Sequence, residues 1–310
     1  MSLSPAETRR CGRLPGLMAM ALLACAWFAA AVAESAQPAA WTLEREDSQV
    51  VLLGSIHLLP PGLAELPTRV RTLYEAADTL VMELAMDQLD PVAFQREVNR
   101  LGRQPEGETL AGSLGEARWE EARALAREID LDLDLLANVQ PWLAALTITQ
   151  LRLVQLGFAP EFGLEVQLTA WAVRDGKPIG GLETAEAQIA VFANLSTEEQ
   201  IDLLMQSLGD AVTLRDDADA IVSAWRSGDV ARMDAELLAS VRESPGLYEA
   251  VVVERNRDWI EPIEALLDTP GTHLVVVGAL HLVGEDSVVA MLEARGHRLE
   301  RLSSIDDPAG

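Results

Sequence analysis

Cysteine is nearly absent from this 310-residue chain, and its two copies, Cys11 and Cys25, both lie close to the amino terminus. The rest of the chain therefore has no disulfide, no thiolate ligand for a metal and no cysteine nucleophile. Lysine is rarer still, with Lys177 as its single copy, which excludes most reactions that proceed through a lysine Schiff base. Only four histidines are present, so each can be weighed individually.

Positive charge is also scarce. The chain has 24 basic and 49 acidic residues, for a formal net charge of −25 at pH 7. A field of this sign disfavours binding to nucleic acids and to anionic membranes. We therefore expect no nucleic acid as a partner.

The amino-terminal segment 1–33 has the pattern of a secretory signal peptide. Its basic start precedes an apolar stretch that ends in Ala31-Val32-Ala33, which predicts cleavage before Glu34 and export to the periplasm. Three alternatives are a lipoprotein anchored at Cys25, a twin-arginine signal at Arg9-Arg10 and an uncleaved anchor. No second long apolar stretch follows, so we expect no stable membrane insertion after cleavage.

The remaining pattern predicts an α/β fold in which helices flank a central β-sheet and a large helical insertion follows. We expect a short linker at 34–40, a single domain at 41–305 and a loose tail at 306–310. Apolar runs bounded by turn residues predict the strands, and 3.6-residue periodicity predicts the helices. The expected strands are 41–45 and 49–56 as a hairpin, 79–84, 177–183, 273–278 and 297–302; the expected helices include 63–77, 114–129, 141–156, 164–175 and 287–294.

One tetrad occurs twice, as Gly54-Ser55-Ile56-His57 and as Gly278-Ala279-Leu280-His281. Each copy follows a β-branched apolar run, so both histidines should lie just past the carboxyl end of a buried strand. Ligands bind at that edge in open α/β sheets. The repetition predicts one site built by His57 and His281, although either histidine could instead be structural.

Three further polar residues share this setting. Glu83 is a charge inside an expected apolar strand, Glu183 ends another strand, and Arg255 follows the segment Val251-Val252-Val253. Histidine with carboxylate suits a Zn, Mn or Fe site and equally suits acid–base catalysis without metal. The spacing does not separate these two possibilities, and no His-Glu-x-x-His or Gly-x-Ser-x-Gly motif is present.

Each of these residues also has a structural interpretation. Glu83 could form a buried ion pair with Arg255, and Glu183 could cap the helix that follows it. We expect His273 and His297 to be ordinary surface or edge residues, and Glu165 to mark a helix start after Gly163.

Several segments together resemble the TraB/GumN family, which includes the Tiki Wnt-inactivating proteases. The resemblance covers about residues 42 to 303. It is carried by Val51–Pro60 (VLLGSIHLLP), Glu83 in VMELAM, Pro178–Gln188 (PIGGLETAEAQ), Glu254–Trp259 (ERNRDW) and Val275–Asp286 (VVVGALHLVGED).

This resemblance implies a fold related to the erythromycin-esterase and ChaN-like proteins. It also implies a divalent metal (Mn, Co or Zn) held by His57, His281 and Glu83, with Arg255 and Glu183 as further site residues. Glu165 departs from the family pattern, which has Asp there. The implied function is an exported metal-dependent, peptidase-like hydrolase that acts on a peptide or another small substrate. The alternatives are a metal-free His/Glu/Arg hydrolase and a non-catalytic protein that binds a peptide, haem or glycan.

Overall fold

The computed structural model describes residues 36–56, 59, 66–159 and 162–302, all within one compact unit that spans 36–310. The expected signal peptide and the expected tail at 306–310 lie outside the described residues, and so does His57. Within the described ranges, no helix combines the length and the apolar character that a membrane crossing requires. Ala40, which we expected to end a linker, already belongs to the first strand and is buried.

A mixed six-stranded sheet forms the centre of the fold, in the order β4-β3-β5-β2-β1-β6. Strands β4, β3, β5 and β2 run parallel to one another, whereas β1 is antiparallel to both β2 and β6. The predicted α/β class is therefore confirmed. The strands are β1 Ala40–Arg45, β2 Ser48–Ser55, β3 Thr79–Met82, β4 Ile179–Gly181, β5 Gly271–Gly278 and β6 Glu300–Arg301.

The sheet register brings the ends of distant segments together. Ser55 at the end of β2 is opposite Gly278 at the end of β5, so the two strands that carry the repeated tetrads are adjacent. On the other side of β5, Met82 of β3 is opposite Val276, and Gly181 of β4 is opposite Met82. Four parallel strands thus end at one edge, which is where ligands bind in sheets of this type.

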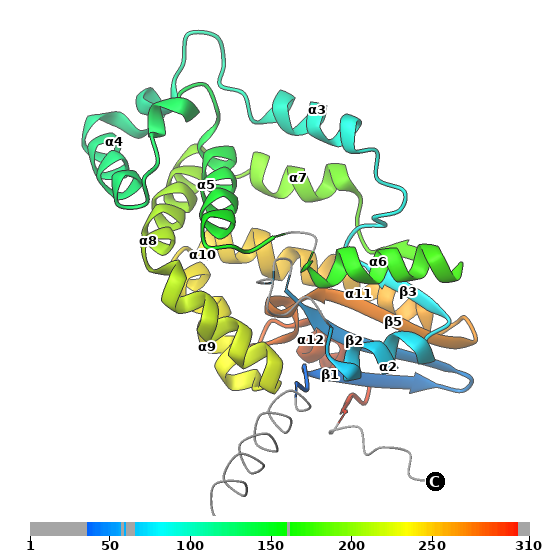
Figure 1. The fold of residues 1–310 in the computed structure, drawn as a ribbon. Coiled ribbons are helices and arrows are strands. Elements are labelled where there is room, and N and C mark those ends of the chain that lie inside the picture. Colours follow the sequence, from blue (N-terminus) through cyan, green and yellow to red (C-terminus); the bar gives the residue numbers. More distant parts are fainter. Residues whose placement is uncertain (1–35, 57–58, 60–65, 160–161, 303–310) are drawn as a thin grey trace, which may run out of the picture. The chain divides into compact units, whose positions relative to one another are not determined.

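Helices surround the sheet and extend away from it (Figure 1). The sheet packs into one large hydrophobic core, and α4, α5 and α8 form a second core of their own around buried residues such as Leu110, Ile148 and Leu204. The helices are α2 Thr68–Ala76, α3 Pro91–Leu101, α4 Leu110–Glu128, α5 Pro141–Gln155, α6 Leu164–Asp175, α7 Ala185–Ala193, α8 Thr197–Ser227, α9 Val230–Arg242, α10 Pro245–Tyr248, α11 Arg255–Leu266 and α12 Val288–Ala294.

Local sequence signals explain most of the boundaries. Asp90 caps α3 by accepting hydrogen bonds from the backbone N–H groups of Val92 and Ala93, and Ser196 starts α8 with a capping box. The expected helix at 63–77 begins only at Thr68, because Pro67 has an extended ψ and serves as its N-cap. The β1–β2 turn needs a left-handed residue, which Glu46 provides with a φ of 49°.

Candidate functional site

Arg255 lies at the centre of a buried polar cluster at the carboxyl edge of the sheet. It is the first residue of α11 and follows a one-turn π-helix, η4 Glu249–Glu254. Such π-turns often occur at functional sites. The side chain of Arg255 is only 10% exposed, so its charge requires partners in the protein interior.

Two carboxylates provide the compensating charge. Nη2 of Arg255 donates to Oε2 of Glu83 at 2.7 Å and to Oε1 of Glu183 at 2.5 Å, and Nε donates to Oε2 of Glu183 at 3.2 Å. The backbone N–H of Gly278 donates to Oε1 of Glu83 at 2.8 Å. Arg255 therefore makes a bidentate pair with Glu183 and a single bond with Glu83, the strong geometry for such ions.

The strand ends explain why these carboxylates meet. β3 ends at Met82, so Glu83 lies one residue beyond the strand; our expectation that the strand includes Glu83 and Leu84 was wrong. Glu183 follows β4 by two residues, and its backbone N–H donates to the carbonyl of Glu83. Thr184 is the N-cap of α7, so the interpretation of Glu183 as the cap is also wrong.

His281 continues the cluster from the end of β5. Nη1 of Arg255 lies 3.1 Å from its Nε2, and Oδ1 of Asn256 lies 2.7 Å from its Nδ1. A guanidinium can only donate, so Nε2 must accept and the imidazole proton must be on Nδ1. His281 is thus neutral in this arrangement, with its Nε2 lone pair directed at Arg255.

Asn256 is fully buried, and a second contact fixes the orientation of its amide. Its Nδ2 donates to the carbonyl of Asp286 at 2.7 Å. The carboxylate of the same Asp286 accepts from the phenol of Tyr248 at 3.0 Å. Gln188 on α7 completes the cluster by donating to Glu183 at 3.0 Å and to Glu83 at 3.3 Å.

The electrostatics favour a permanently charged Arg255. Burial lowers its pKa, but the hydrogen bond with Glu183 and the charges of Glu83 and Glu183 outweigh that effect, so the pKa of Arg255 is raised above its ordinary value. The ring of Trp259 adds a cation–π contact, with its centroid 4.7 Å from the guanidinium carbon. The same ring packs 4.5 Å from that of His281, centroid to centroid.

The end of β2 provides a second polar pair. The hydroxyl of Ser55 donates to the carboxylate of Glu165, which lies in the first turn of α6, and Ser55 is buried. The indole N–H of Trp225 donates to the carbonyl of Gly54 at 2.7 Å. His57 follows this strand end but lies outside the described residues, so its expected place beside His281 remains a prediction.

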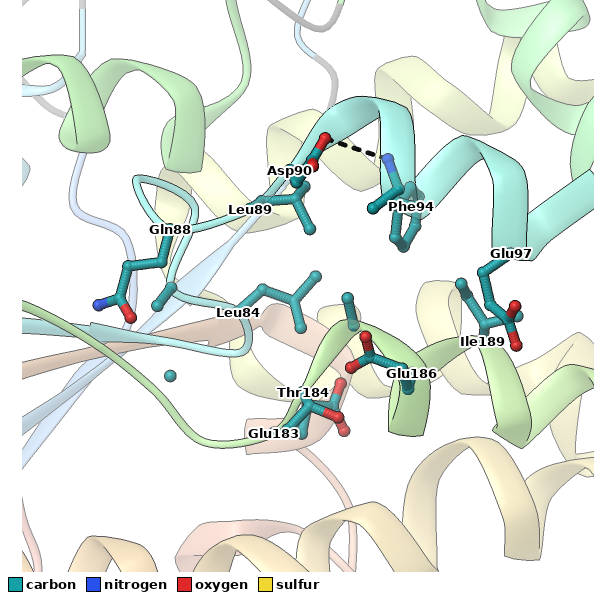
Figure 2. Close-up of a pocket in the computed structure, with 14 residues that line it drawn as sticks. Leu84, Gln88, Leu89, Asp90, Phe94, Glu97, Glu183, Thr184, Glu186 and Ile189 are labelled. Carbon is teal, nitrogen blue, oxygen red and sulfur yellow. Dashed lines mark hydrogen bonds between the residues drawn. The ribbon is translucent and has the colours of Figure 1, made fainter.

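Two hollows flank α7, and each is lined by a member of the cluster. The first, about 470 Å³, lies between α3 and α7 and includes Glu183 in its wall. Figure 2 shows Phe94 and Glu186 facing it from opposite sides. The second, about 540 Å³, lies between α7 and the η4–α11 segment and includes Arg255 in its wall. Arg255 is the member of the cluster that borders this second hollow.

The described residues do not fit a metal ion in this arrangement. A zinc–imidazole bond is about 2.0–2.1 Å long, whereas Nη1 of Arg255 lies only 3.1 Å from the Nε2 of His281. An ion on that lone pair would nearly coincide with a cationic nitrogen. Among the described residues, no group of three or more His, Cys, Asp or Glu residues is arranged to hold a metal.

The other two histidines lie away from this cluster. His273 was expected at the surface or edge, but it is 2% exposed, which makes that expectation wrong. Its Nε2 donates to the carbonyl of Thr269 at 2.9 Å, and its Nδ1 accepts from Thr79 at 2.7 Å. His297 pairs with Glu264 at 2.8 Å and is partly exposed.

Two members of the cluster, Asn256 and Gln188, were not among the predicted site residues. Asn256 could have been found from the sequence, because it follows Arg255 directly in a helix that also carries buried Trp259. Gln188 lies five residues after Glu183, and the turn between β4 and α7 brings the two side chains into contact. Sequence spacing alone gave no signal for this contact.

Comparisons with known proteins match most of the length of this chain. The chain is 28% identical to the uncharacterized protein YbaP of Escherichia coli (strain K12) over 241 residues, which cover 78% of this chain and 86% of YbaP, and the same values hold for YbaP of Shigella flexneri. No solved structure matches the chain. The TraB/PrgY/gumN family matches residues 39–301, a range that includes every strand and the whole polar cluster. The chain belongs to the TraB/PrgY/gumN family.

Proposed function

We propose that the protein is an exported hydrolase acting on peptide bonds, in which Arg255 stabilises the developing oxyanion and His57 is the general base. One observation carries this proposal. Four of the five N–H groups of the Arg255 guanidinium have partners among the described residues, and the fifth, on Nη1, has none there. A buried, rigidly held donor of this kind is suited to a charge that develops during a reaction.

The reaction is a single displacement by water. His57 removes a proton from water while the water oxygen bonds to the carbonyl carbon, and the π electrons of that carbonyl move to its oxygen. Arg255 donates to this oxyanion through Nη1. The intermediate then collapses, the carbon–nitrogen bond breaks, and His57 returns the proton to the departing amine.

The other cluster residues hold the donor in place. Glu83 and Glu183 fix the guanidinium from one side, and His281 accepts from Nη1 on the other. Because this arrangement exists before substrate binds, no reorganisation is needed at the moment of reaction. We infer that substrate approaches Arg255 through the second hollow, whose wall includes this residue.

A metal-dependent form of the reaction, with a divalent ion on His57, His281 and Glu83, is the second candidate. One observation favours it. Nδ1 of His281 is anchored by Asn256 in the way that metal-binding imidazoles usually are. This form requires Arg255 to leave Nε2 of His281.

The test is turnover of fluorescein-labelled casein and p-nitrophenyl acetate by purified processed protein, after treatment with EDTA and after addition of Mn²⁺, Co²⁺ or Zn²⁺. The proposal expects turnover that survives EDTA. His57→Ala should lower it by roughly 10²–10⁴-fold and Arg255→Lys by roughly 10²–10³-fold. His297→Ala, a histidine change away from the cluster, is the matched control and should leave turnover unchanged.

Other results would replace the proposal. Turnover that appears only with added metal supports the second candidate. Casein binding without any turnover, unaffected by His57→Ala, supports a non-catalytic binding protein.

A further inference from the structure

Contacts on both ring nitrogens fix the orientation of His281. Each contact traces back to a group that can act only as a donor or only as an acceptor. On one side, Arg255 can only donate to Nε2. On the other side, the carbonyl of Asp286 can only accept, so the amide of Asn256 must present Nδ2 to it and Oδ1 to Nδ1 of His281. Each constraint alone requires the proton on Nδ1, and they agree.

Asp286, the residue farthest from His281 in this chain of hydrogen bonds, is itself fixed by a side-chain contact. Tyr248, at the end of α10, donates its phenol proton to the carboxylate of Asp286 at 3.0 Å. Burial, followed by the hydrogen bond to Asp286, raises the pKa of Tyr248 above its ordinary value of 10. The phenol therefore remains a donor at neutral pH and tethers the residue whose carbonyl orients Asn256.

We propose that Asn256 is a positioning residue that holds His281 as the Nδ1–H tautomer and thereby keeps its Nε2 lone pair on Arg255, with the Tyr248–Asp286 contact fixing the amide from outside. Asn256 is fully buried and contacts His281 on its Nδ1 side, away from Arg255. The expected effect of Asn256 on turnover rests on the proposed function. The expected effect of Asn256 on the His281 tautomer does not depend on that function.

His273 provides an internal control for this proposal. Its Nε2 donates to the carbonyl of Thr269, so it must carry its proton on Nε2, opposite to His281. The fold thus contains two buried histidines with opposite tautomers, set by opposite partners. One spectrum of the wild-type protein can observe both.

The first measurement is nitrogen-15 NMR of protein labelled at histidine, with signals assigned by His281→Gln and His273→Gln variants. We expect a protonated Nδ1 and an unprotonated Nε2 for His281, and the reverse for His273. An unprotonated Nδ1 at His281 in the wild-type protein overturns the proposal, whatever the activity.

The second measurement uses Asn256→Leu, which has a similar volume but no acceptor. We expect the Nδ1–H signal of His281 to lose its protection from solvent exchange while the signals of His273 stay unchanged. Turnover should fall by roughly 10- to 100-fold through kcat with little change in KM, the range typical of a lost outer partner of a functional imidazole. Asn256→Asp keeps the acceptor and should retain the Nδ1–H signal. Asn99→Leu makes the same change at an exposed position of α3 and should alter neither readout.

The two proposals fail separately. A wild-type spectrum as expected, in a protein without any turnover, leaves the positioning role intact and refutes the hydrolase. An unchanged His281 signal and unchanged kcat in folded Asn256→Leu refute the positioning role alone.

Discussion

Replacing Glu83 with Gln tests how Arg255 is held. In the wild-type protein, Oε1 of Glu83 accepts from the backbone of Gly278 and Oε2 accepts from Arg255. A glutamine has only one acceptor oxygen, so whichever way its amide is turned, an NH₂ group must face a donor. The change also removes one of the two charges that balance Arg255.

The size of the effect follows from burial. Breaking a buried ion pair by removing one partner costs roughly 3–5 kcal/mol, and we expect the lower end because Glu183 still pairs with Arg255. The matched control is Glu198→Gln, which removes a carboxylate from an Arg118 pair whose glutamate side chain is 62% exposed. Exposed pairs contribute roughly 0–1 kcal/mol, so the control should change stability little.

Urea unfolding of both variants gives the comparison, with turnover measured on the same samples. We expect Glu83→Gln to lower the free energy of unfolding by about 3 kcal/mol and to reduce turnover as Arg255 loses its orientation. In an Arg255→Met background the same change should cost far less, because the buried charge then has no arginine partner to lose. If Glu83→Gln and Glu198→Gln destabilise the protein equally, the reasoning about the buried cluster is refuted.

Three further predictions concern other parts of the chain. Mass spectrometry of the periplasmic fraction should find a mature amino terminus at Glu34 or within a few residues, whereas an intact Met1 or a lipid on Cys25 contradicts the predicted export and cleavage. Burial, with a hydrogen bond to Asp175, raises the pKa of Tyr74 from 10 to about 12. The folded state therefore holds the phenol proton more tightly than the unfolded state does. The stability that this proton contributes is complete below pH 10 and is lost as the pH rises toward 12. Tyr74→Phe should therefore flatten the fall in unfolding free energy between pH 10 and 12, and an unchanged slope speaks against the shift. His273→Leu should cost roughly 0.5–1.5 kcal/mol, because the half-buried hydroxyl of Thr79 loses its acceptor and the carbonyl of Thr269 keeps only its bond from Ser48. It should leave turnover intact, so a loss of turnover without loss of stability contradicts the structural role.

The sequence was most informative where a local signal determines local structure. The hairpin and the strands that carry the two tetrads followed from turn residues and apolar runs. The same pattern could not give the order of the strands, because pairing of β5 between β2 and β3 depends on contacts between residues over 190 positions apart. That order is what brings Glu83 to Gly278.

Burial of polar residues was harder to predict. His273 lies at the start of an apolar run, which suggests an edge, but its partners Thr79 and Thr269 come from other elements and allow it to be buried. The partnership of Arg255 with both Glu83 and Glu183 likewise depends on two strand ends meeting one helix start. Such sites are found from the sequence as separate candidates, and only tertiary structure shows which of them interact.

Nη1 of Arg255 occupies the Nε2 face of His281, and we predict that His57 shares this site without a metal ion between the two histidines. The most direct measurement is anomalous diffraction, at the Mn and Zn edges, from crystals of the processed protein soaked in each metal. We expect His57 to lie in the same cavity as His281, no anomalous peak between them, and Nη1 of Arg255 still within hydrogen-bond distance of Nε2. A peak coordinated by His57 and His281, with Arg255 displaced from Nε2, would contradict this claim and establish the metal-dependent alternative.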